Sequence, residues 1–434
     1  MRRVLFLAYH FPPVGGAGVQ RPARFVRYLP EFGYDPVVIT GRGAAKGRWT
    51  PKDASLESEV PADIEVHRIV EPEPSPATWD VRLQRWLRID SRWASWWKRG
   101  ALELGRSVGR TCDLVYAWMQ PYETAPLAST LARELAMPWV ADLGDPWALD
   151  EMIVYPSRLH RRLELRTMGR ILGTAAAVSM STEEAADRVR RRFRELDGTP
   201  VVAIPNGFDA RDFAGPAPVR KPDVFRIVHT GYLHTALGRK YQRFAPLRRI
   251  LGGAVPGVDV LPRSHIYLLE ALDRLFAARP ELRGRIELHL AGVLSDADRE
   301  VIGDNEAVKV HEYVEHAEAV SMMRGADLLF LPMHDVNGSR ATIVPGKTYE
   351  YLASDAPILA AVPAGDAKEL MLTAGNTSVC APTDVSAMVT AIEARVDAER
   401  VGRASQPRRQ DVVAQYEYRH LAGRLARLFD GVLS

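Results

Sequence analysis

Cysteine is nearly absent from the chain, since Cys112 and Cys380 are its two cysteines among 434 residues. This number and spacing exclude a disulfide framework and a cysteine-ligated zinc site, and they favour a reducing compartment such as the cytoplasm. A strong charge of one sign is also missing, because 57 basic and 54 acidic side chains leave a net charge of +3. That balance argues against a dedicated nucleic-acid-binding protein.

Long apolar runs and metal-binding patterns are missing too. No stretch reaches the ~18 apolar residues that indicate a transmembrane helix. The start, MRRVLFLAYHFPP, resembles a signal peptide, but its apolar run covers residues 4–8 and no small-residue cleavage site follows. We interpret it as a buried first strand. The histidines show no ligand spacing, and we expect His316 on a surface helix. Asp296 and Asp298 form a D-x-D sequence that we interpret as the start of a polar helix, so we expect no metal ion.

The composition that remains is that of a globular protein, with 47% apolar and 26% charged residues. Short apolar runs alternate with helical periodicity along the whole chain, which predicts an α/β fold with parallel sheets. The strands that we predict are residues 4–8, 36–40, 114–119, 139–142, 177–180 and 201–204 in the first half, and 226–230, 286–291, 308–310, 327–332, 357–362 and 378–381 in the second.

A polar stretch with four prolines, at about residues 205–222, predicts a linker between two doubly wound domains. We therefore place the first domain at residues 1–204 and the second at 205–410, with a ligand cleft between them. Residues 238–262 are rich in arginine, glycine and proline, and we predict a long loop insertion there. Residues 411–433 have an amphipathic pattern that predicts a terminal helix.

A glycine-rich turn joins the first predicted strand to the helix that follows. Gly15, Gly16 and Gly18 lie there, so backbone N–H groups and the helix dipole could receive an anion. The spacing is not G-x-G-x-x-G, and no acidic residue ends the next strand, which argues against a nicotinamide-dependent oxidoreductase. The alternative interpretation is a tight turn without a ligand.

The segment around residues 340–353 carries a second candidate site. We expect Pro345 at the first helical position and Gly346 beside an open helix end. Lys347 and Glu350 are three residues apart and therefore share a helix face. A diphosphate could bind at the helix end beside Lys347, with the ribose diol on Glu350. The alternative is a solvated ion pair, the common case for such residues.

Several segments, in this order and at strand ends, resemble glycosyltransferase family 4, whose members are retaining enzymes of the GT-B fold. The segments are FPPVGGAGVQR at residues 11–21, WVADLGDPW at 139–147, IPNGFD at 204–209, HTGYL at 229–233, HLAG at 289–292, YVEHAEAVSMMRGADLLFLP at 313–332 and PGKTYEYLASDAPILA at 345–360. The resemblance runs the length of the chain, apart from the insertion at 238–262. It implies two Rossmann-like domains facing a cleft, with the terminal helix crossing back to the first domain.

The resemblance also implies the substrates and several residue roles. The second domain would bind a nucleotide-diphosphate sugar and the first an acceptor, which is a sugar, a lipid-linked molecule or a small molecule. No further cofactor is implied. Glu350 matches the second glutamate of the family's E-x7-E motif, which holds the ribose. Other donor-binding positions fall on Gly15, Gly16, Gly18, Tyr313, Val314, Pro345, Gly346 and Lys347.

The chain departs from the family pattern at two positions. Thr342 stands where the first motif glutamate belongs, and Gly144 stands where related loops carry an arginine. Asp142 and Asp145 are candidates to orient the acceptor hydroxyl or to stabilise the positive sugar, and the alternative for both is capping of the helix that follows.

The reaction implied needs mainly the neutralisation of the leaving diphosphate. Lys347, Arg239 and Lys240 are the basic candidates, with Arg263 as a fallback. We therefore expect a metal-independent, retaining glycosyltransferase of polysaccharide, glycolipid or glycosylated-metabolite synthesis. The alternatives are a GT-B sugar-nucleotide epimerase and a weakly active donor-binding partner subunit.

Tryptophan is concentrated in residues 79–97, at Trp79, Trp86, Trp93, Trp96 and Trp97, and six basic residues are interleaved within 79–99. Such a stretch predicts peripheral contact with the cytoplasmic face of a membrane. It also predicts that residues 79–97 lie on the acceptor side, where Trp96 and Trp97 would contribute to acceptor or lipid binding from an accessible surface. The alternative places the tryptophans in the core and the arginines in solvent.

Overall fold

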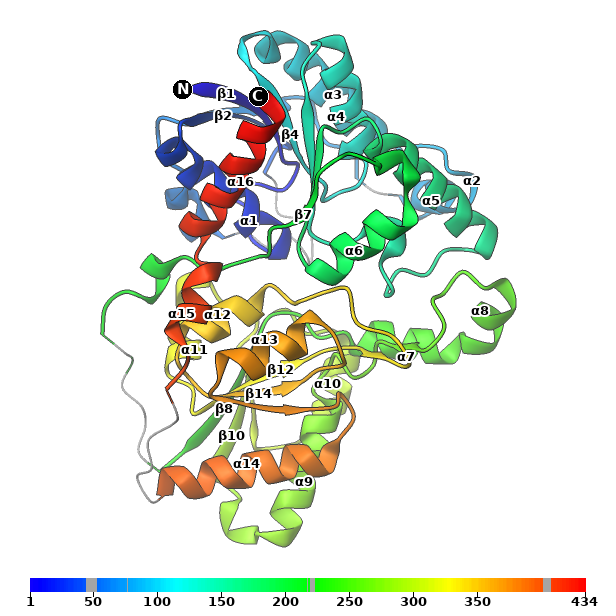
Figure 1. Cartoon of the computed structure of the whole chain (residues 1–434). Coiled ribbons are helices and arrows are strands. Elements are labelled where there is room, and N and C mark those ends of the chain that lie inside the picture. Colours follow the sequence, from blue (N-terminus) through cyan, green and yellow to red (C-terminus); the bar gives the residue numbers. More distant parts are fainter. Residues whose placement is uncertain (44–52, 76, 217, 219–222, 401–406) are drawn as a thin grey trace. The chain divides into compact units, whose positions relative to one another are not determined.

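The structure is a computed structural model, and it describes all residues except 44–52, 76, 217, 219–222 and 401–406. The chain divides into two compact units, each with a parallel sheet covered by helices (Figure 1). Unit 1 contains Met1–Gly207, Arg248–Ala254 and Tyr418–Ser434, and unit 2 contains Phe208–Leu247 and Val255–Glu417. The predicted fold, with two doubly wound α/β domains, is confirmed.

Unit 1 is built on a sheet with the strand order β3-β2-β1-β4-β5-β6-β7. These strands are, in that order, Glu65–Arg68, Tyr34–Thr40, Arg2–Leu7, Leu114–Trp118, Trp139–Leu143, Ala177–Met180 and Val201–Ala203. The N-terminal apolar run forms the buried strand β1, as predicted. Strand β3 was not predicted, because its sequence EVHR is polar and lies half-exposed at the sheet edge.

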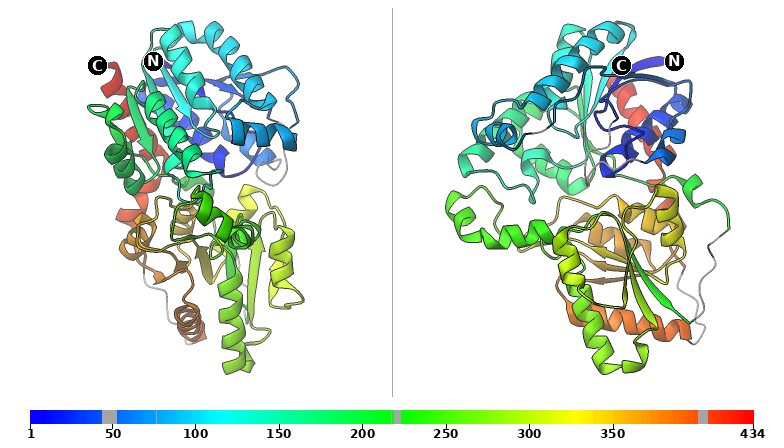
Figure 2. Two further views of the ribbon diagram at one scale, coloured as in Figure 1. Left: turned by 90° about the vertical axis from the view of Figure 1, so that its right-hand side faces the viewer. Right: turned by 180° about the vertical axis from the view of Figure 1, so that it is seen from behind.

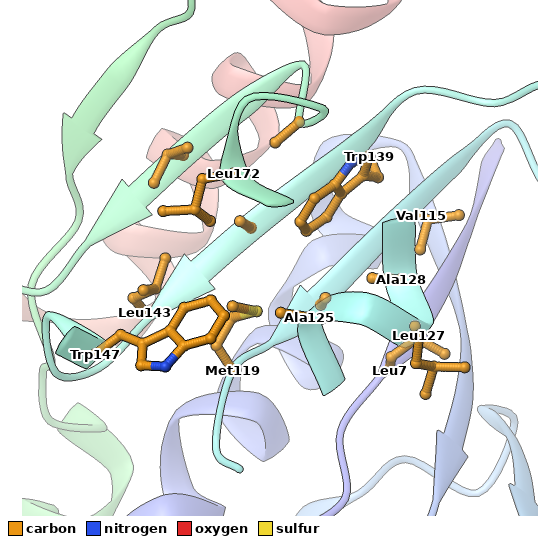
Figure 3. Packing of buried hydrophobic residues seen from close by; sticks show 14 of the residues in the cluster. Leu7, Val115, Met119, Ala125, Leu127, Ala128, Trp139, Leu143, Trp147 and Leu172 are labelled. Carbon is orange, nitrogen blue, oxygen red and sulfur yellow. The ribbon is translucent and has the colours of Figure 1, made fainter. Parts of the chain in front are cut away.

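Helices cover both faces of this sheet. They are α1 (Ala17–Tyr28), α3 (Arg92–Val108), α4 (Thr124–Glu134), α5 (Arg158–Leu172), α6 (Glu183–Arg192) and α16 (Tyr418–Leu433), whereas α2 (Thr78–Leu87) adds no residue to the two cores. Successive residues of β1 point to opposite faces. Leu5 and Leu7 pack in the core formed with α3, α4, α5 and α6, part of which Figure 3 shows, whereas Val4 and Phe6 pack with α1 and α16.

Helix α16 completes the second of these cores. Leu421, Leu425 and Phe429 are fully buried, and α16 lies beside α1 (Figure 1). The return of the terminal helix to the first domain is therefore confirmed. The predicted helix at 411–433 is nevertheless interrupted, because α15 (Gln410–Val413) belongs to unit 2 and residues 414–417 turn the chain before α16 begins.

Unit 2 is built on a sheet with the strand order β11-β10-β8-β12-β14-β15. These strands are, in that order, Val308–Val310, Ile286–Ala291, Phe225–Thr230, Leu328–Pro332, Ile358–Ala361 and Thr377–Cys380. Helices α9 (Ile266–Ala278) and α14 (Val385–Arg400) lie side by side on one face (Figure 2). Helices α11 (His316–Arg324), α12 (Lys347–Ala353) and α13 (Asp366–Ala374) cover the other, and α10 (Asp296–Ile302) follows β10.

The prediction of a loop at residues 238–262 is wrong. The segment contains the end of α7 (Thr235–Arg243), all of α8 (Ala245–Leu251) and β9 (Val258–Asp259), which pairs antiparallel with β13 (Asp335–Val336). Arginine favours helix, and Pro246 lies in the first turn of α8, where proline is tolerated. Helix periodicity is hard to recognise here because both helices are short.

The tryptophans of α2 and α3 differ in environment. Trp96 and Trp97 on α3 are buried in the core of unit 1, so the prediction that they lie on an accessible surface is wrong. Trp79 and Trp86 on α2 are exposed. Within the part of the chain that the structure describes, no helix is both long and apolar enough to cross a membrane.

Candidate functional site

In the parallel sheet of unit 2, the order in which the chain adds strands reverses between β8 and β12. From β8 the chain first adds β10 and β11 on one side, and it then adds β12, β14 and β15 on the other. In doubly wound folds, ligands bind at the carboxyl ends of the strands beside such a point. The carboxyl end of β8 is His229–Thr230, and the Thr230 N–H donates to the Tyr351 hydroxyl at 2.9 Å. This hydrogen bond fixes α12, which carries Lys347 and Glu350, against the end of β8.

Lys347 is held there by a histidine. The Lys347 Nζ lies 3.1 Å from His229 Nε2, while His229 Nδ1 lies 3.0 Å from the carbonyl oxygen of Phe330. Burial, together with the charge of Lys347, holds the pKa of His229 well below its usual value, so its ring is neutral. Its Nδ1–H therefore donates to Phe330, and its Nε2 accepts from the ammonium of Lys347.

The surroundings of Lys347 disfavour its own charge. Burial and the nearby guanidinium of Arg263 lower the pKa of Lys347 to about 7, against an opposing contribution from Glu350. A lysine whose pKa is lowered this far indicates a place where a bound anion would be stabilised. The cation beside Lys347 is thus Arg263, the fallback of the sequence prediction.

Arg239 and Lys240 do not join this group. Both are exposed on α7, and the Arg239 guanidinium pairs with Glu300 of α10. Their contribution to the donor site stays a prediction, and the structure places both side chains on the exposed side of α7.

Glu350 takes part in a chain of polar side chains with His316 and Asp212. His316 Nε2 lies 2.9 Å from Asp212 Oδ2, and His316 Nδ1 lies 3.8 Å from Glu350 Oε1. The three side chains are largely buried, so His316 is not on an exposed helix face as predicted. The imidazole lies between two carboxylates and limits where the Glu350 carboxylate can point.

The remaining predicted donor residues of unit 2 are loop positions. Tyr313 and Val314 are half-buried in the segment that leads into α11, and Glu315 separates them from His316. Pro345 and Gly346 form a turn ahead of α12, with the Thr348 N–H donating to the Pro345 carbonyl at 3.0 Å. The expectation that Pro345 occupies the first helical position is wrong, since α12 begins at Lys347.

In the sheet of unit 1, the order of strand addition reverses in the same way between β1 and β4. Three loops converge there. The Trp118 indole N–H donates to the Gly18 carbonyl at 2.8 Å, and the Gln120 amide lies 3.2 Å from Asp145 Oδ2. A Cβ on Gly18 would lie 2.8 Å from the Gln120 amide oxygen, so glycine permits this approach. Gly18 and Asp145 are therefore brought together, as neighbours of Gln120.

The first two glycines of the turn lie beside this group. Gly16 precedes α1 with a φ of 106°, which favours glycine, and Gly15 is buried. His10, at the start of the same loop, has its pKa lowered to about 4 by burial, so its ring is neutral. The turn is thus built by backbone conformation and close packing, within unit 1.

Asp142 has a structural environment that does not fit its predicted role. Its two oxygens accept hydrogen bonds from the Arg21 guanidinium at 2.7 and 2.8 Å, and the Tyr116 hydroxyl donates to it as well. Arg21 and Asp142 are both buried, and Arg21 also donates to the carbonyls of Ile204 and Pro205. Asp142 is therefore enclosed by its own unit and has no exposed surface.

Gly144 has a steric explanation. A Cβ at this position would lie 2.7 Å from Trp118 Cη2 and 3.0 Å from the Gln120 amide nitrogen. The space that an arginine would need is thus filled by Trp118 and Gln120. The loss of the family's arginine from the loop after β5 is therefore accompanied by bulky side chains at the end of β4 and in the loop after it.

The D-x-D sequence is part of a helix cap. Asp298 accepts hydrogen bonds from the Ser295 N–H at 2.7 Å and the Ser295 hydroxyl at 2.6 Å, which is a capping box at the start of α10. The interpretation as a helix start is confirmed. Among the described residues, no group of three or more histidine, cysteine or carboxylate side chains is arranged to hold a metal ion.

Two family models match the chain. Residues 15–207 match the glycosyl transferase 4-like domain, and residues 261–397 match glycosyl transferases group 1. No curated protein matches the sequence. The first match covers every strand of the first sheet except β1, and the second covers every strand of the six-stranded second sheet except β8.

Solved structures resemble the whole chain. The Anabaena protein HepE in complex with UDP and glucose is 14% identical, with a TM-score of 0.60 over 99% of this chain and 100% of that one. A Methanocaldococcus jannaschii UDP-GlcNAc 2-epimerase is 11% identical, with a TM-score of 0.52 and the same coverage. The N-terminal domain of a Candida albicans trehalose-6-phosphate phosphatase is 13% identical, with a TM-score of 0.58 over 99% and 97% of the chains. Likeness at these identities shows a shared fold.

Proposed function

Because the chain consists of two glycosyltransferase domains of the GT-B fold, we propose that it transfers a sugar from a nucleotide-diphosphate donor to an acceptor hydroxyl, with retention at the transferred carbon. The acceptor is a sugar, a lipid-linked molecule or a small molecule, and the product belongs to polysaccharide, glycolipid or glycosylated-metabolite synthesis. Transfer takes place in the cytoplasm and needs no metal.

One observation carries the proposal: Lys347 is buried beside a neutral histidine and near the Arg263 guanidinium, at the carboxyl end of β8. This group of side chains is positively charged and lies in the domain that matches glycosyl transferases group 1. A bound diphosphate would stabilise the ammonium of Lys347. Glu350, held by His316, would accept hydrogen bonds from the ribose hydroxyls one helical turn further along α12.

The proposed chemistry is a displacement on one face of the sugar. The bond between the anomeric carbon and the diphosphate oxygen breaks, the acceptor oxygen bonds to that carbon, and the hydroxyl proton passes to the departing diphosphate. Negative charge grows on the diphosphate during this step, and preorganised cations stabilise it. Lys347 and Arg263 supply that charge. Asp145 orients the acceptor hydroxyl, and Tyr313 and Val314 frame the base through their backbone groups.

The test is turnover of a panel of nucleotide-diphosphate sugars, each with and without sugar and lipid acceptors and with and without EDTA. We expect a glycosylated product and free nucleoside diphosphate with one donor, undiminished by EDTA. Epimerised nucleotide sugar without an acceptor would instead assign the chain to epimerisation. Loss of turnover in EDTA, restored by manganese or magnesium, would contradict metal independence.

Glu350→Gln tests the ribose contact separately. The variant should bind nucleoside diphosphate about ten- to a hundredfold more weakly, because a hydrogen bond to a charged group is weakened. His316→Asn should weaken binding in the same direction by releasing Glu350. Glu369→Gln is the matched control, since Glu369 lies on α13 and pairs with Arg340 at the surface. Equal affinity of Glu350→Gln and Glu369→Gln would refute the assignment.

A further inference from the structure

Helix α2 exposes an apolar face. Trp79, Leu83, Trp86 and Leu87 follow the spacing i, i+4, i+7, i+8, so they lie on one side of the helix. Their exposed fractions are 57%, 39%, 54% and 59%, whereas the tryptophans of α3 at 96 and 97 are 3% and 0% exposed. An apolar helix face left in solvent on this scale indicates a binding surface.

Helix α5 extends this face. The rings of Trp86 and His160 are in edge contact at 5.7 Å, and His160 Nε2 lies 3.0 Å from the Trp86 carbonyl oxygen. These contacts place the first turn of α5 beside α2 (Figure 1). Leu159, next to His160, is 61% exposed. We call this region the α2–α5 surface and define it by Trp79, Arg82, Leu83, Trp86, Leu159 and Arg162.

Arginines accompany the apolar residues. Arg82 lies on the exposed side of α2, Arg158 and Arg162 are exposed one turn apart on α5, and the Arg92 guanidinium stacks over the Trp79 ring at 5.5 Å. Asp80, the acidic residue of α2, is buried. Since the whole chain has a net charge of only +3, this concentration of exposed arginines is local.

The helical insertion contributes to the same region of unit 1. The Tyr155 N–H donates to the Gly253 carbonyl at 3.0 Å, and a Cβ on Gly252 would lie 2.2 Å from Arg158 Nε. Residues 248–254 therefore pack against the segment that leads into α5. Ile250, within them, is 82% exposed. The insertion thus adds an apolar side chain beside the α2–α5 surface.

We propose that the α2–α5 surface binds an anionic lipid membrane. Indole rings favour the level of the lipid headgroups, and guanidinium groups pair with lipid phosphates. A second copy of the chain fits this surface less well, because the arginines of its own α2–α5 surface would repel the arginines here. The proposal does not depend on the sugar or on the acceptor of the enzyme. It replaces the sequence prediction for 79–99, which included the buried tryptophans of α3.

The experiment is flotation of the full chain with vesicles of phosphatidylcholine alone and with vesicles that also contain phosphatidylglycerol. We expect binding to the anionic vesicles that weakens with added salt. Trp79→Ser with Trp86→Ser should lower the partition coefficient about tenfold or more, because large apolar side chains no longer leave water. Leu372→Ser is the control, since Leu372 is 62% exposed on α13.

A second pair of variants tests the charge. Arg82→Glu with Arg162→Glu should lower the partition coefficient at least ~25-fold, because each arginine near an anionic surface contributes about fivefold and the new carboxylates are repelled as well. Arg274→Glu with Arg285→Glu, in unit 2, should leave it unchanged. Equal binding to both kinds of vesicle, or none by the wild type, would overturn the proposal. So would a dimer of the wild type that dissociates in the tryptophan variant, because the surface would then bind a second copy.

Discussion

Lys347 gives the donor site a pH dependence. Its pKa of about 7 means that the free enzyme loses the ammonium as pH rises through that value. The kcat/KM for the donor reports the free enzyme and should therefore fall above pH ~7. The kcat should hold to higher pH, because a bound diphosphate favours the charged lysine. Lys347→Met should lower kcat and remove this fall, and an unchanged pH profile in that variant would rule Lys347 out.

The burial of Lys347 also lowers the stability of the folded chain. The pKa of Lys347 is lower in the folded chain than its ordinary value of 10.5, so the unfolded chain binds the proton more tightly between these values. The folded state is therefore penalised below pH 7, and the penalty disappears as pH rises towards 10.5. In melting experiments, Lys347→Met should raise the melting temperature more below pH 7 than near pH ~10.

Asp142 yields a stability prediction. Asp142→Asn leaves the buried Arg21 guanidinium without its counter-charge, so the free energy of unfolding should fall by about 3–5 kcal/mol in urea titrations. Asp145→Asn, in the partly exposed loop after β5, should change it much less. If Asp142→Asn unfolds like the wild type but no longer transfers sugar, Asp142 contacts the acceptor after all.

Residues were predictable where their partners are close in sequence. The three-residue spacing of Lys347 and Glu350 was enough to place both on one helix face. His316 and Arg21 were not recognised, because their partners Asp212 and Asp142 lie 104 and 121 residues away. A polar residue at a strand end, such as His229, was the available signal, but spacing alone could not connect it to Lys347.

Among the elements, α16 offers the clearest test of packing. Phe429 is fully buried among residues of α1 and the first sheet. Phe429→Ala should lower the free energy of unfolding by about 3–5 kcal/mol in urea titrations. Arg427→Ala is the control on the same helix, since Arg427 is exposed and its loss should change little. Similar values for the two variants would mean that α16 is not part of this core.

Strands were predictable because buried parallel strands are continuous apolar runs. The buried run at 177–180 matches β6 to the residue, and the ranges 286–291 and 308–310, which include polar residues, match β10 and β11 to the residue. Edge strand β3 lacks such a run because solvent reaches it. The insertion was misread because α7 and α8 are short and include arginines, glycine and proline, so composition suggested a loop while local propensity allowed helix.

At the scale of the whole molecule, nucleotide binding should act unevenly. A nucleoside diphosphate at a hundred times its dissociation constant adds about 2.7 kcal/mol to the state that binds it. In hydrogen-exchange mass spectrometry, peptides of β8 and α12 should exchange more slowly, whereas peptides of β4 and β5 in unit 1 should not. Protection limited to β4 and β5 would move the donor site to unit 1.

The segmented make-up of unit 1 also bears on how the chain is synthesised. Its last segment, Tyr418–Ser434, leaves the ribosome some 210 residues after Gly207. At ~5–20 residues per second, this interval lasts roughly 10–40 seconds. During that time α16 is not yet present to bury Phe6, Phe25 and Tyr116. The newly made chain therefore presents an open apolar face to chaperones until α16 has left the ribosome, and its yield in cells should depend on them.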